Sequence, residues 1–325
     1  MQIFFAPMEG ITSVFLRSLH AKIFGGCDKY FTPFISTNDS VKLNGREKED
    51  VDPDNSKGYT LVPQIISNDP DQSLLYIKLL KERYSYDEIN INMGCPSGTV
   101  TAKNKGSGLI RNTDLLDEYL DGLFEGAEKL AGDGFDLPDI TVKTRIGYYS
   151  EDEYKNILDV FLRYPVKQFI IHPRTRNEFY GGSVHMDVFS AMYDELKKKG
   201  ALVCYNGDIK TVSDLEDIVK RFPDLDAVMT GRGILTDPSL GRRIRGGRGV
   251  TREEYLEYME SLLDIYSGRI GNDKFVLAKM KDLWNFSVNA FCGNEKGYKE
   301  MCKAVSVESY RICMRQYIRN SDLRV

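Results

Sequence analysis

A cysteine in a loop broken by glycine and proline is the side chain that the sequence best equips for chemistry. Cys95 stands between Gly94 and Pro96, directly after the alternating segment 89–92, and these residues end any strand there. A thiol has an ordinary pKa of about 8.5, so it is mostly protonated yet transferable near neutral pH. Cys95 is therefore a candidate proton donor or nucleophile. The alternative is a small buried hydrophobic side chain.

Lys143 is a second candidate, because it falls inside an otherwise apolar run. A flavin gains negative charge on reduction, and a cation beside its N1 and O2 edge stabilises the anionic hydroquinone. Gln64, which also lies inside an apolar run, would then hydrogen-bond the polar edge of the isoalloxazine. The backbone of Ala6-Pro7-Met8-Glu9 would lie along the ring. An internal ion pair is the alternative for Lys143.

Two glycine-bearing turns indicate a phosphate site. They are Asn206-Gly207-Asp208 and Gly231-Arg232-Gly233. Backbone amides next to glycine approach a phosphate closely, and the guanidinium of Arg232 would add a charge-assisted contact. Simple tight turns are the alternative.

The elements that must position these side chains are short apolar runs, most of them separated by segments of helical periodicity. Polar residues stand at the ends of the runs: Gln64, Asn92, Lys143 with Arg145, and His172 with Arg174, besides the two glycine turns. Strands are expected at 3–6, 30–34, 61–66, 88–92, 140–144, 168–172, 202–205 and 226–230, with helices at 73–84, 114–130, 151–164, 186–199 and 212–222.

This alternation predicts a (β/α)8 TIM barrel, in which active sites gather at the carboxyl ends of the strands. A doubly wound open sheet is the alternative, but no Gly-x-Gly-x-x-Gly opens an early βα unit. We therefore expect a barrel domain at 1–245. Helices without intervening strands are predicted at 253–266, 274–291 and 298–318, which gives a separate all-α helical bundle domain at 246–325.

Composition sets outer limits on function. The chain has 325 residues and a net charge of -4, and no apolar run approaches the roughly 18 residues of a membrane span. The six cysteines include no Cys-x-x-Cys pair, which argues against a zinc site or a disulfide framework. We expect a cytoplasmic protein without a membrane contact, and no pattern points to a protein partner. Residues 246–325 carry 13 Lys and Arg against 11 Asp and Glu, a weak basic excess.

Six short motifs follow one another along most of the barrel: Ala-Pro-Met-Glu-Gly at 6–10, Asn-Met-Gly-Cys-Pro at 92–96, Lys-Thr-Arg-Ile-Gly at 143–147, His-Pro-Arg-Thr-Arg at 172–176, Asn-Gly-Asp-Ile at 206–209 and Met-Thr-Gly-Arg-Gly at 229–233. In type and order these motifs resemble a known family, the tRNA-dihydrouridine synthases. Two departures are visible: Thr12-Ser13 stands where many members have Thr-Asp, and Pro173 where many have Gly.

The resemblance implies an FMN-dependent enzyme that reduces uridine in tRNA to 5,6-dihydrouridine, with NADPH as the electron source. Hydride would pass from flavin N5 to C6, and Cys95 would protonate C5. Asn92 would orient the base, with Lys143, Arg145 or Arg174 stabilising charge on its carbonyls. The implied FMN contacts are Pro7, Met8, Glu9, Gln64, Lys143, His172, Asn206, Gly207, Asp208, Gly231 and Arg232.

Recognition of a folded RNA would need cationic contacts around the mouth of the site. Arg242, Arg243, Arg245 and the helical series Arg311, Arg315, Arg319 are candidates, although solvated helix faces look the same. The segment 98–108 could close over the site. Two other functions stay open: an FMN oxidoreductase of a free pyrimidine metabolite, similar to dihydroorotate dehydrogenase, and a catalytically idle tRNA-binding protein.

Overall fold

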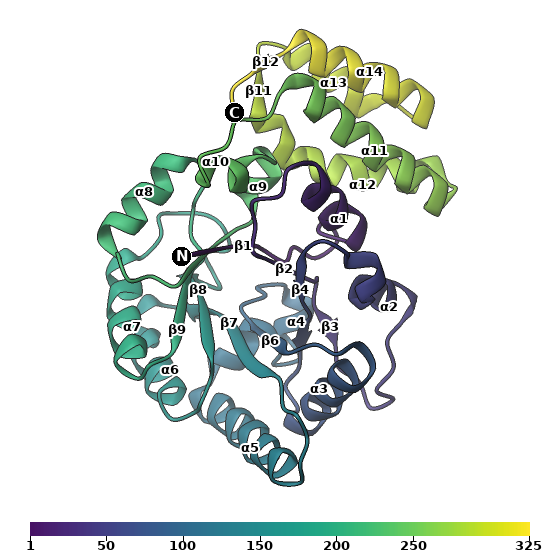
Figure 1. Ribbon diagram of the computed structural model, residues 1–325. Coiled ribbons are helices and arrows are strands. Elements are labelled where there is room, and N and C mark those ends of the chain that lie inside the picture. Colours follow the sequence, from purple (N-terminus) through teal and green to yellow (C-terminus); the bar gives the residue numbers. More distant parts are fainter.

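The predicted strands pair in parallel around a ring, with helices outside it (Figure 1). The computed structural model describes residues 1–325. Ten strand segments follow one another in the sheet, and their order β3-β5-β6-β7-β8-β9-β10-β1-β2-β4 leaves β3 and β4 at its formal ends. The segments are β1 (Gln2–Phe5), β2 (Lys29–Phe31), β3 (Ile35–Ser36), β4 (Thr60–Val62), β5 (Gln64–Ile66), β6 (Glu88–Met93), β7 (Asp139–Gly147), β8 (Gln168–Thr175), β9 (Leu202–Tyr205) and β10 (Ala227–Thr230).

The ring closes at Pro63, which separates β4 from β5. Proline has no N–H, so it interrupts the ladder and divides one predicted strand, 61–66, into two. On one side of Pro63, β4 pairs with β2, and on the other side β5 pairs with β6. The Pro63 carbonyl itself accepts from Asn90 N at 2.9 Å. The ten segments therefore make the eight strands of a closed barrel, which confirms the predicted fold class and excludes the open sheet.

Small and aromatic side chains fill the inside of the barrel below the polar end. A cluster of eight buried residues, separate from the main core, comes from alternate positions of the strands, as expected when every second side chain points inward. It consists of Phe4, Ala6, Phe31, Val62, Ile170, Cys204, Ala227 and Met229. Cys204 is thus a packing cysteine.

The outer helices begin where the sequence provides capping side chains. Asp69 accepts from Gln72 N at 3.0 Å ahead of α3 (Pro70–Tyr84), and Asn112 accepts from Asp114 N at 2.9 Å ahead of α5 (Thr113–Gly132). The other large barrel helices are α6 (Tyr154–Phe161), α7 (Met186–Lys198) and α8 (Val212–Arg221), and short helices fill the loops: α2 (Gly45–Val51), α4 (Gly98–Thr101), α9 (Arg232–Thr236) and α10 (Leu240–Ile244).

The helix α1 (Val14–Ile23) has a capping group that is distant in the sequence. Ser13 stands at its N-cap without a side-chain cap bond, and Asp50 of α2 instead accepts from Val14 N at 2.7 Å. The Asp50 carboxylate also accepts from Arg17, and both side chains are nearly inaccessible to water. A distant aspartate thus caps the helix where the adjacent serine does not.

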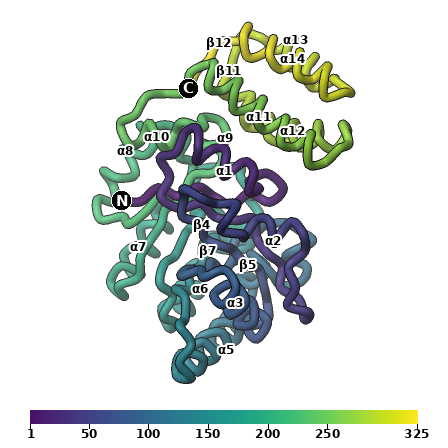
Figure 2. The backbone as a smooth tube through the Cα atoms, turned by 45° about the vertical axis from the view of Figure 1, so that its right-hand side comes forward, coloured from purple at the N-terminus to yellow at the C-terminus, as the bar shows by residue number.

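The region beyond the barrel is helical, and it forms a layer beside α1, α9 and α10 (Figures 1 and 2). It contains α11 (Arg252–Ile270), α12 (Asp273–Ser287), α13 (Glu295–Lys303) and α14 (Val307–Asn320). The single helix predicted at 298–318 is wrong, because the chain breaks at 304–306 and Ser306 caps a new helix. The prediction that no strand separates the helices of residues 246–325 is also wrong, because β11 (Phe291–Cys292) pairs with β12 (Asp322–Leu323).

No helix of the structure is both long and apolar enough to cross a membrane.

Candidate active site

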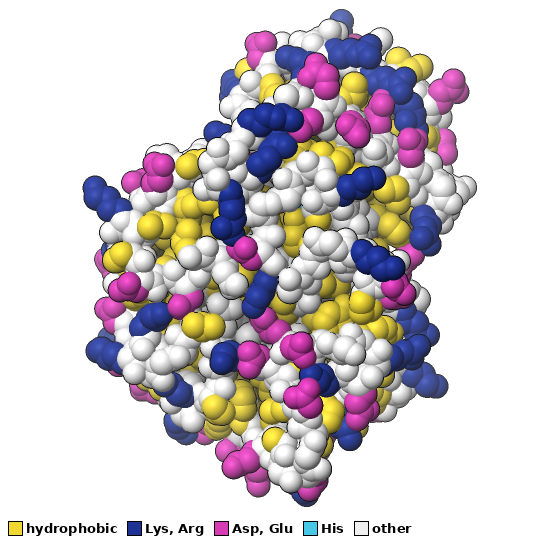
Figure 3. All heavy atoms as spheres, in the orientation of Figure 1, with side chains coloured by type: hydrophobic (Ala, Val, Ile, Leu, Met, Phe, Trp, Pro, Cys, Tyr) yellow, Lys and Arg dark blue, Asp and Glu magenta, His cyan; other side chains and the backbone are white.

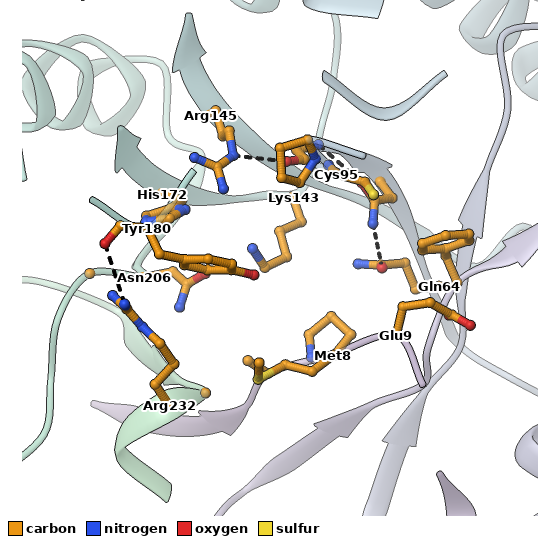
Figure 4. A pocket seen from close by; sticks show the side chains of 18 of the residues that line it. Met8, Glu9, Gln64, Cys95, Lys143, Arg145, His172, Tyr180, Asn206 and Arg232 are labelled. Atoms are coloured by element: carbon orange, nitrogen blue, oxygen red, sulfur yellow. Dashed lines mark hydrogen bonds between the residues drawn. The ribbon is translucent and has the colours of Figure 1, made fainter. Parts of the chain in front are cut away.

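A cavity of about 240 Å³ opens at the carboxyl ends of the barrel strands. Figure 4 shows side chains from almost every strand converging on it. All but one of the predicted site residues line it, and Arg174 is the exception. Those that line it are Pro7, Met8, Glu9, Gln64, Asn92, Cys95, Lys143, Arg145, His172, Asn206, Gly207, Asp208, Gly231 and Arg232.

The Asn92 side chain holds the backbone of the cysteine loop. Its carbonyl oxygen accepts from Gly94 N at 3.0 Å and from Cys95 N at 2.9 Å. Its amide nitrogen donates to Gln64 Oε1 at 2.7 Å. The Asn92 carboxamide is therefore engaged with protein, and it orients Cys95.

A chain of hydrogen bonds continues from Gln64 through the barrel interior. Gln64 Nε2 donates to Asn90 Oδ1 at 2.7 Å, and Asn90 Nδ2 donates to Thr141 Oγ1 at 2.9 Å. Thr141 in turn donates to Glu88 at 3.1 Å. Of these side chains, Gln64 is the one that the sequence marked as polar within an apolar run. Their polar groups satisfy one another, as buried polar groups must.

A second set of contacts fixes the cysteine loop from the opposite side. Ser107 donates to the Cys95 carbonyl from its hydroxyl at 2.8 Å and from its N–H at 3.1 Å. Arg145 Nε donates to the Gly94 carbonyl at 2.9 Å. Gly106 packs so closely that an added Cβ would lie 2.9 Å from the Cys95 carbonyl oxygen. The backbone that carries the thiol is thus fixed by hydrogen bonds from Asn92 on one side and from Ser107 and Arg145 on the other.

Burial raises the pKa of the Cys95 thiol, although the nearby cations Arg145 and Lys143 oppose this effect. The thiol is therefore protonated at neutral pH and can serve as a proton donor rather than as a thiolate nucleophile.

Lys143 has no ion-pair or hydrogen-bond partner in the protein, and its side chain points into the cavity (Figure 4). The alternative of an internal ion pair is therefore excluded. Burial, together with the charge of Arg145, lowers the pKa of Lys143 to about 8. A partly desolvated cation without a counterion favours an anionic ligand.

The other cation of β7 is buried and satisfied by carbonyl groups. Arg145 NH1 donates to Thr175 O and to Phe179 O, each at 2.8 Å. Burial lowers the pKa of Arg145 to about 10, so it remains charged at neutral pH.

His172 is neutral. Burial and the surrounding cations, Arg145 and Lys143 foremost, lower its pKa well below the ordinary value. Its Nε2 lies 3.3 Å from Arg174 NH1, which can only donate, so the proton of the imidazole is on Nδ1. His172 can therefore donate a hydrogen bond to a bound group from Nδ1.

Asp208 is paired with two arginines at one end of the cavity. Arg174 donates to it at 2.6 and 3.1 Å, and Arg232 forms a further ion pair. Burial acts to raise the pKa of Asp208, but Arg174 and Arg232 outweigh it and hold the pKa below the ordinary value. Arg174 also donates to Gly181 O and Gly182 O. Its guanidinium faces protein groups instead of the cavity, contrary to a direct substrate contact.

The two glycine turns, the first of which contains Asp208, border one end of the cavity. Gly207 has no room for a side chain, because an added Cβ would lie 2.0 Å from the Tyr205 hydroxyl. Asn206 Nδ2 donates to Met229 O at 2.8 Å and so joins the first turn to β10, which leads into the second. On the opposite rim, Glu9 pairs with Arg46 at 2.7 Å.

Sequence reasoning missed several lining residues, of which Tyr180 is the largest. Its ring lies 4.8 Å from the Arg232 guanidinium and 6.1 Å from the His172 ring. The signal in the sequence was the aromatic pair Phe179-Tyr180 followed by Gly181-Gly182, between a predicted strand and a predicted helix. Pro33 and Phe34, on the opposite wall, follow β2 and were read as strand.

The expected closing loop is mostly docked. Residues 106–110 are buried, and Lys105 Nζ donates to Thr37 O at 3.0 Å. The reason is the tight contact with Cys95, which leaves exposed only Gly98, Thr99, Ala102 and Lys103.

The arginines proposed for RNA are mostly neutralised by acidic partners. Arg311 and Arg315 pair with Asp264 and Glu260 of α11, so they join α14 to α11. On the face in Figure 3, Lys and Arg are interspersed with Asp and Glu over the barrel and the helical region. The arginines after α9 are paired as well: Arg242 with Glu254, Arg243 with Asp237 and Arg245 with Asp28.

Solved structures share this architecture. Morphinone reductase superposes with a TM-score of 0.51 at 9% identity, covering 77% of this chain and 87% of that one. A structure of morphinone reductase in complex with tetrahydroNAD gives a TM-score of 0.52 at 8% identity, covering 77% and 88%. The fold and the cavity together define a (β/α)8-barrel protein with its site at the carboxyl ends of the strands.

The family follows from the sequence comparison. The family model described as "Dihydrouridine synthase (Dus)" matches residues 4–307, and the chain belongs to this family. A probable tRNA-dihydrouridine synthase of Staphylococcus aureus (strain COL) is 31% identical over 244 residues, or 72% of this chain and 68% of that protein. A probable tRNA-dihydrouridine synthase 2 of Bacillus subtilis (strain 168) is 29% identical over 244 residues, covering 72% and 69%. The chain is thus a flavin-dependent oxidoreductase, and the predicted resemblance is confirmed.

Proposed function

We propose that this protein reduces the C5–C6 double bond of a uridine in tRNA, with FMN as the flavin, NADPH as the reductant and Cys95 as the proton donor. One observation carries the proposal: a protonated thiol and a lysine without a counterion face one cavity at the polar end of the barrel. A reduction that adds hydride and proton to a pyrimidine needs an acid on one side and an electron carrier on the other.

The side chains present suit an FMN. Lys143 has no other partner and would meet the edge of the ring that becomes anionic. The glycine turns 206–208 and 231–233, with Arg232, would hold the phosphate. Pro7, Met8 and Glu9 would border the ring. When bound and reduced, FMN supplies the hydride.

Some of the predicted FMN contacts would act through protein neighbours. Gln64 lines the cavity, but its amide bonds to Asn90 and Asn92, so its main effect would be to hold the cysteine loop. His172 would donate from Nδ1, and Asp208 would orient Arg232. We assign Arg174 to positioning Asp208 and His172.

Cys95 would deliver its proton to C5 of the pyrimidine as negative charge develops on the ring. Its raised pKa keeps the thiol protonated until that charge forms. Asn92 and Arg145 hold the loop backbone, and the buried positive charge of Arg145 would stabilise the anionic ring through space. The thiolate that remains would recover its proton from solvent.

The RNA would present its target base unstacked, because the cavity lies inside the barrel rim. We propose a division into an FMN-binding domain at 1–245 and a helical tRNA-binding domain at 246–325. The helical layer stands beside the barrel and could bear on a large substrate (Figure 2).

The test is direct. Purified protein should show flavin absorption that NADPH bleaches, and tRNA transcript should reoxidise the flavin and gain dihydrouridine. Cys95→Ala should lower uridine reduction by about 10²-fold or more while NADPH still bleaches the flavin. Full uridine reduction by this variant would refute the role of the thiol. Reoxidation by a free pyrimidine but not by tRNA would favour a metabolite oxidoreductase instead.

A further inference from the structure

Exposed aromatic side chains gather on two neighbouring loops at the carboxyl ends of the strands, and one of them, Tyr180, lines the cavity. Tyr149 is 61% exposed, Phe179 44% and Tyr180 48%, although large aromatic side chains are usually buried. They come from the loops that follow β7 and β8. Tyr149 packs edge-on against Tyr148 with ring centroids 4.6 Å apart. Neighbouring loops thus present several rings to solvent at the entrance.

Arginines stand beside two rings of these loops, the exposed Phe179 and the buried Tyr148. The Arg176 guanidinium lies 5.2 Å from both ring centroids, and Arg111 lies 5.5 Å from that of Tyr148, on which Tyr149 packs. Neither arginine pairs with a carboxylate: Arg176 donates to Asn177 at 3.1 Å and Arg111 to Asn104 at 2.7 Å. Their charge is therefore available, in contrast to the paired arginines of α14.

Most acidic groups next to the rings are already engaged. Glu153 accepts from the N–H groups of Tyr148 and Tyr149, Glu178 accepts from Thr175 N at 2.6 Å, and Glu151 pairs with His185, whereas the carboxylate of Asp152 is exposed without a partner. These bonds shape the two loops and leave the rings and guanidinium groups facing outward.

The patch is connected to the cysteine loop. Arg176 Nε donates to the Pro96 carbonyl at 3.1 Å, one residue from Cys95, and the Tyr180 ring lines the cavity itself. A ligand lying on these rings would therefore border whatever enters the cavity.

The backbone of Phe179 is held in a costly conformation. Its φ is +52°, in the left-handed region that bulky residues rarely adopt. The Arg145 guanidinium binds its carbonyl at 2.8 Å, and its N–H donates to Arg176 O at 3.2 Å. The surrounding contacts thus enforce a geometry that turns this aromatic side chain to the surface.

We propose that Tyr149, Phe179 and Tyr180, with Arg111 and Arg176, form a stacking surface for the unpaired nucleotides that flank the target uridine. The inference rests on the proposed function. Flat rings interleaved with unpaired arginines suit single-stranded RNA, because every base has a face that can stack and a phosphate that can meet a guanidinium. A base drawn from its stack leaves neighbours that need such a surface.

The test compares Tyr149→Ala, Tyr149→Phe and Phe179→Asn, since asparagine tolerates the left-handed backbone. Leu75→Ala is the control, because Leu75 is 48% exposed on α3 and does not line the cavity. The measurements are KM and kcat for a tRNA transcript, its dissociation constant, and flavin reduction by NADPH without RNA. Flavin reduction reports whether each variant is folded and loaded with cofactor.

We expect Tyr149→Ala and Phe179→Asn each to weaken RNA binding and to raise KM by about tenfold, the effect of losing one stacked base. Tyr149→Phe should restore binding, and Leu75→Ala should match the wild type. If both aromatic variants bind and modify the transcript like the wild type, the proposal is overturned and the patch is left to a protein partner. If the wild type itself makes no dihydrouridine, the proposed function fails first, whatever the variants do.

Discussion

Replacing Lys143 with methionine should make the flavin-free protein more stable while removing its capacity to bind flavin tightly. Lys143 has no counterion, and burial lowers its pKa from 10.5 to about 8. That interval corresponds to a penalty of roughly 3 kcal/mol on the charged form, at about 1.36 kcal/mol per pH unit. Water in the open cavity screens part of this penalty, so we expect the free energy of unfolding to rise by about 1–3 kcal/mol at pH 7.

The stability difference between the wild type and Lys143→Met should depend on pH. The pKa of Lys143 is lower in the folded state than in the unfolded state, so the wild type bears the full penalty below pH 8. The penalty fades between pH 8 and 10.5, and the two proteins should converge there. Urea denaturation of flavin-free protein across this range measures the difference.

The control for this experiment is Lys167→Met, an exposed lysine without an ion pair, which should change stability by less than about 0.5 kcal/mol at every pH. A Lys143→Met protein that is less stable than the wild type at pH 7 would refute the reasoning. So would a difference between the two proteins that does not change with pH.

Three further predictions concern other parts of the barrel. Asp50→Ala should lower the free energy of unfolding by about 3–5 kcal/mol, because it leaves the buried Arg17 without its carboxylate partner. Asp54→Ala, which removes an exposed ion pair with Lys57, should lower it by less than about 1 kcal/mol, and chemical denaturation measures both. Gly106→Ala and Gly134→Ala both place alanine at positive φ, which should cost about 1–2 kcal/mol in each case. Gly106→Ala should cost more than this and should also lower the rate of uridine reduction, since only its Cβ meets the cysteine loop. Asn92→Ala should lower the single-turnover rate constant of uridine reduction by about 10²-fold with flavin content unchanged, and a wild-type rate would show that the loop holds its shape without this side chain.

The strands could be predicted because each is a short apolar run with breakers at its ends, and the barrel follows from their alternation with helices. The interruption at Pro63 could have been predicted, since proline removes a ladder donor. The start of α1 could not, because its capping group is Asp50, which is distant in sequence. The break at 304–306 was hidden by apolar periodicity that continues through it, and only Ser306 marked the new helix.

The sequence was enough to predict most of the residues at the candidate site, but not the hydrogen bonds that they make. Residue types and strand ends were enough to gather Cys95, Lys143 and His172 at one cavity. Which side chains face the cavity and which face each other depends on three-dimensional neighbours. Gln64 and Arg174 illustrate this: both are polar at strand ends, yet their donors are taken by other protein groups.

The hydrogen-bonded series from the Cys95 amide to Glu88 has a direction. Every member donates toward the Glu88 end, where a carboxylate can only accept. The carboxylate at the closed end and the backbone N–H groups of Gly94 and Cys95 at the other end fix which way three carboxamides face, and reversing any of them would set two donors or two acceptors against each other. The loop that carries the sulfur is thus matched in hydrogen-bond polarity to a charge on the far side of the barrel, beyond the reach of substrate.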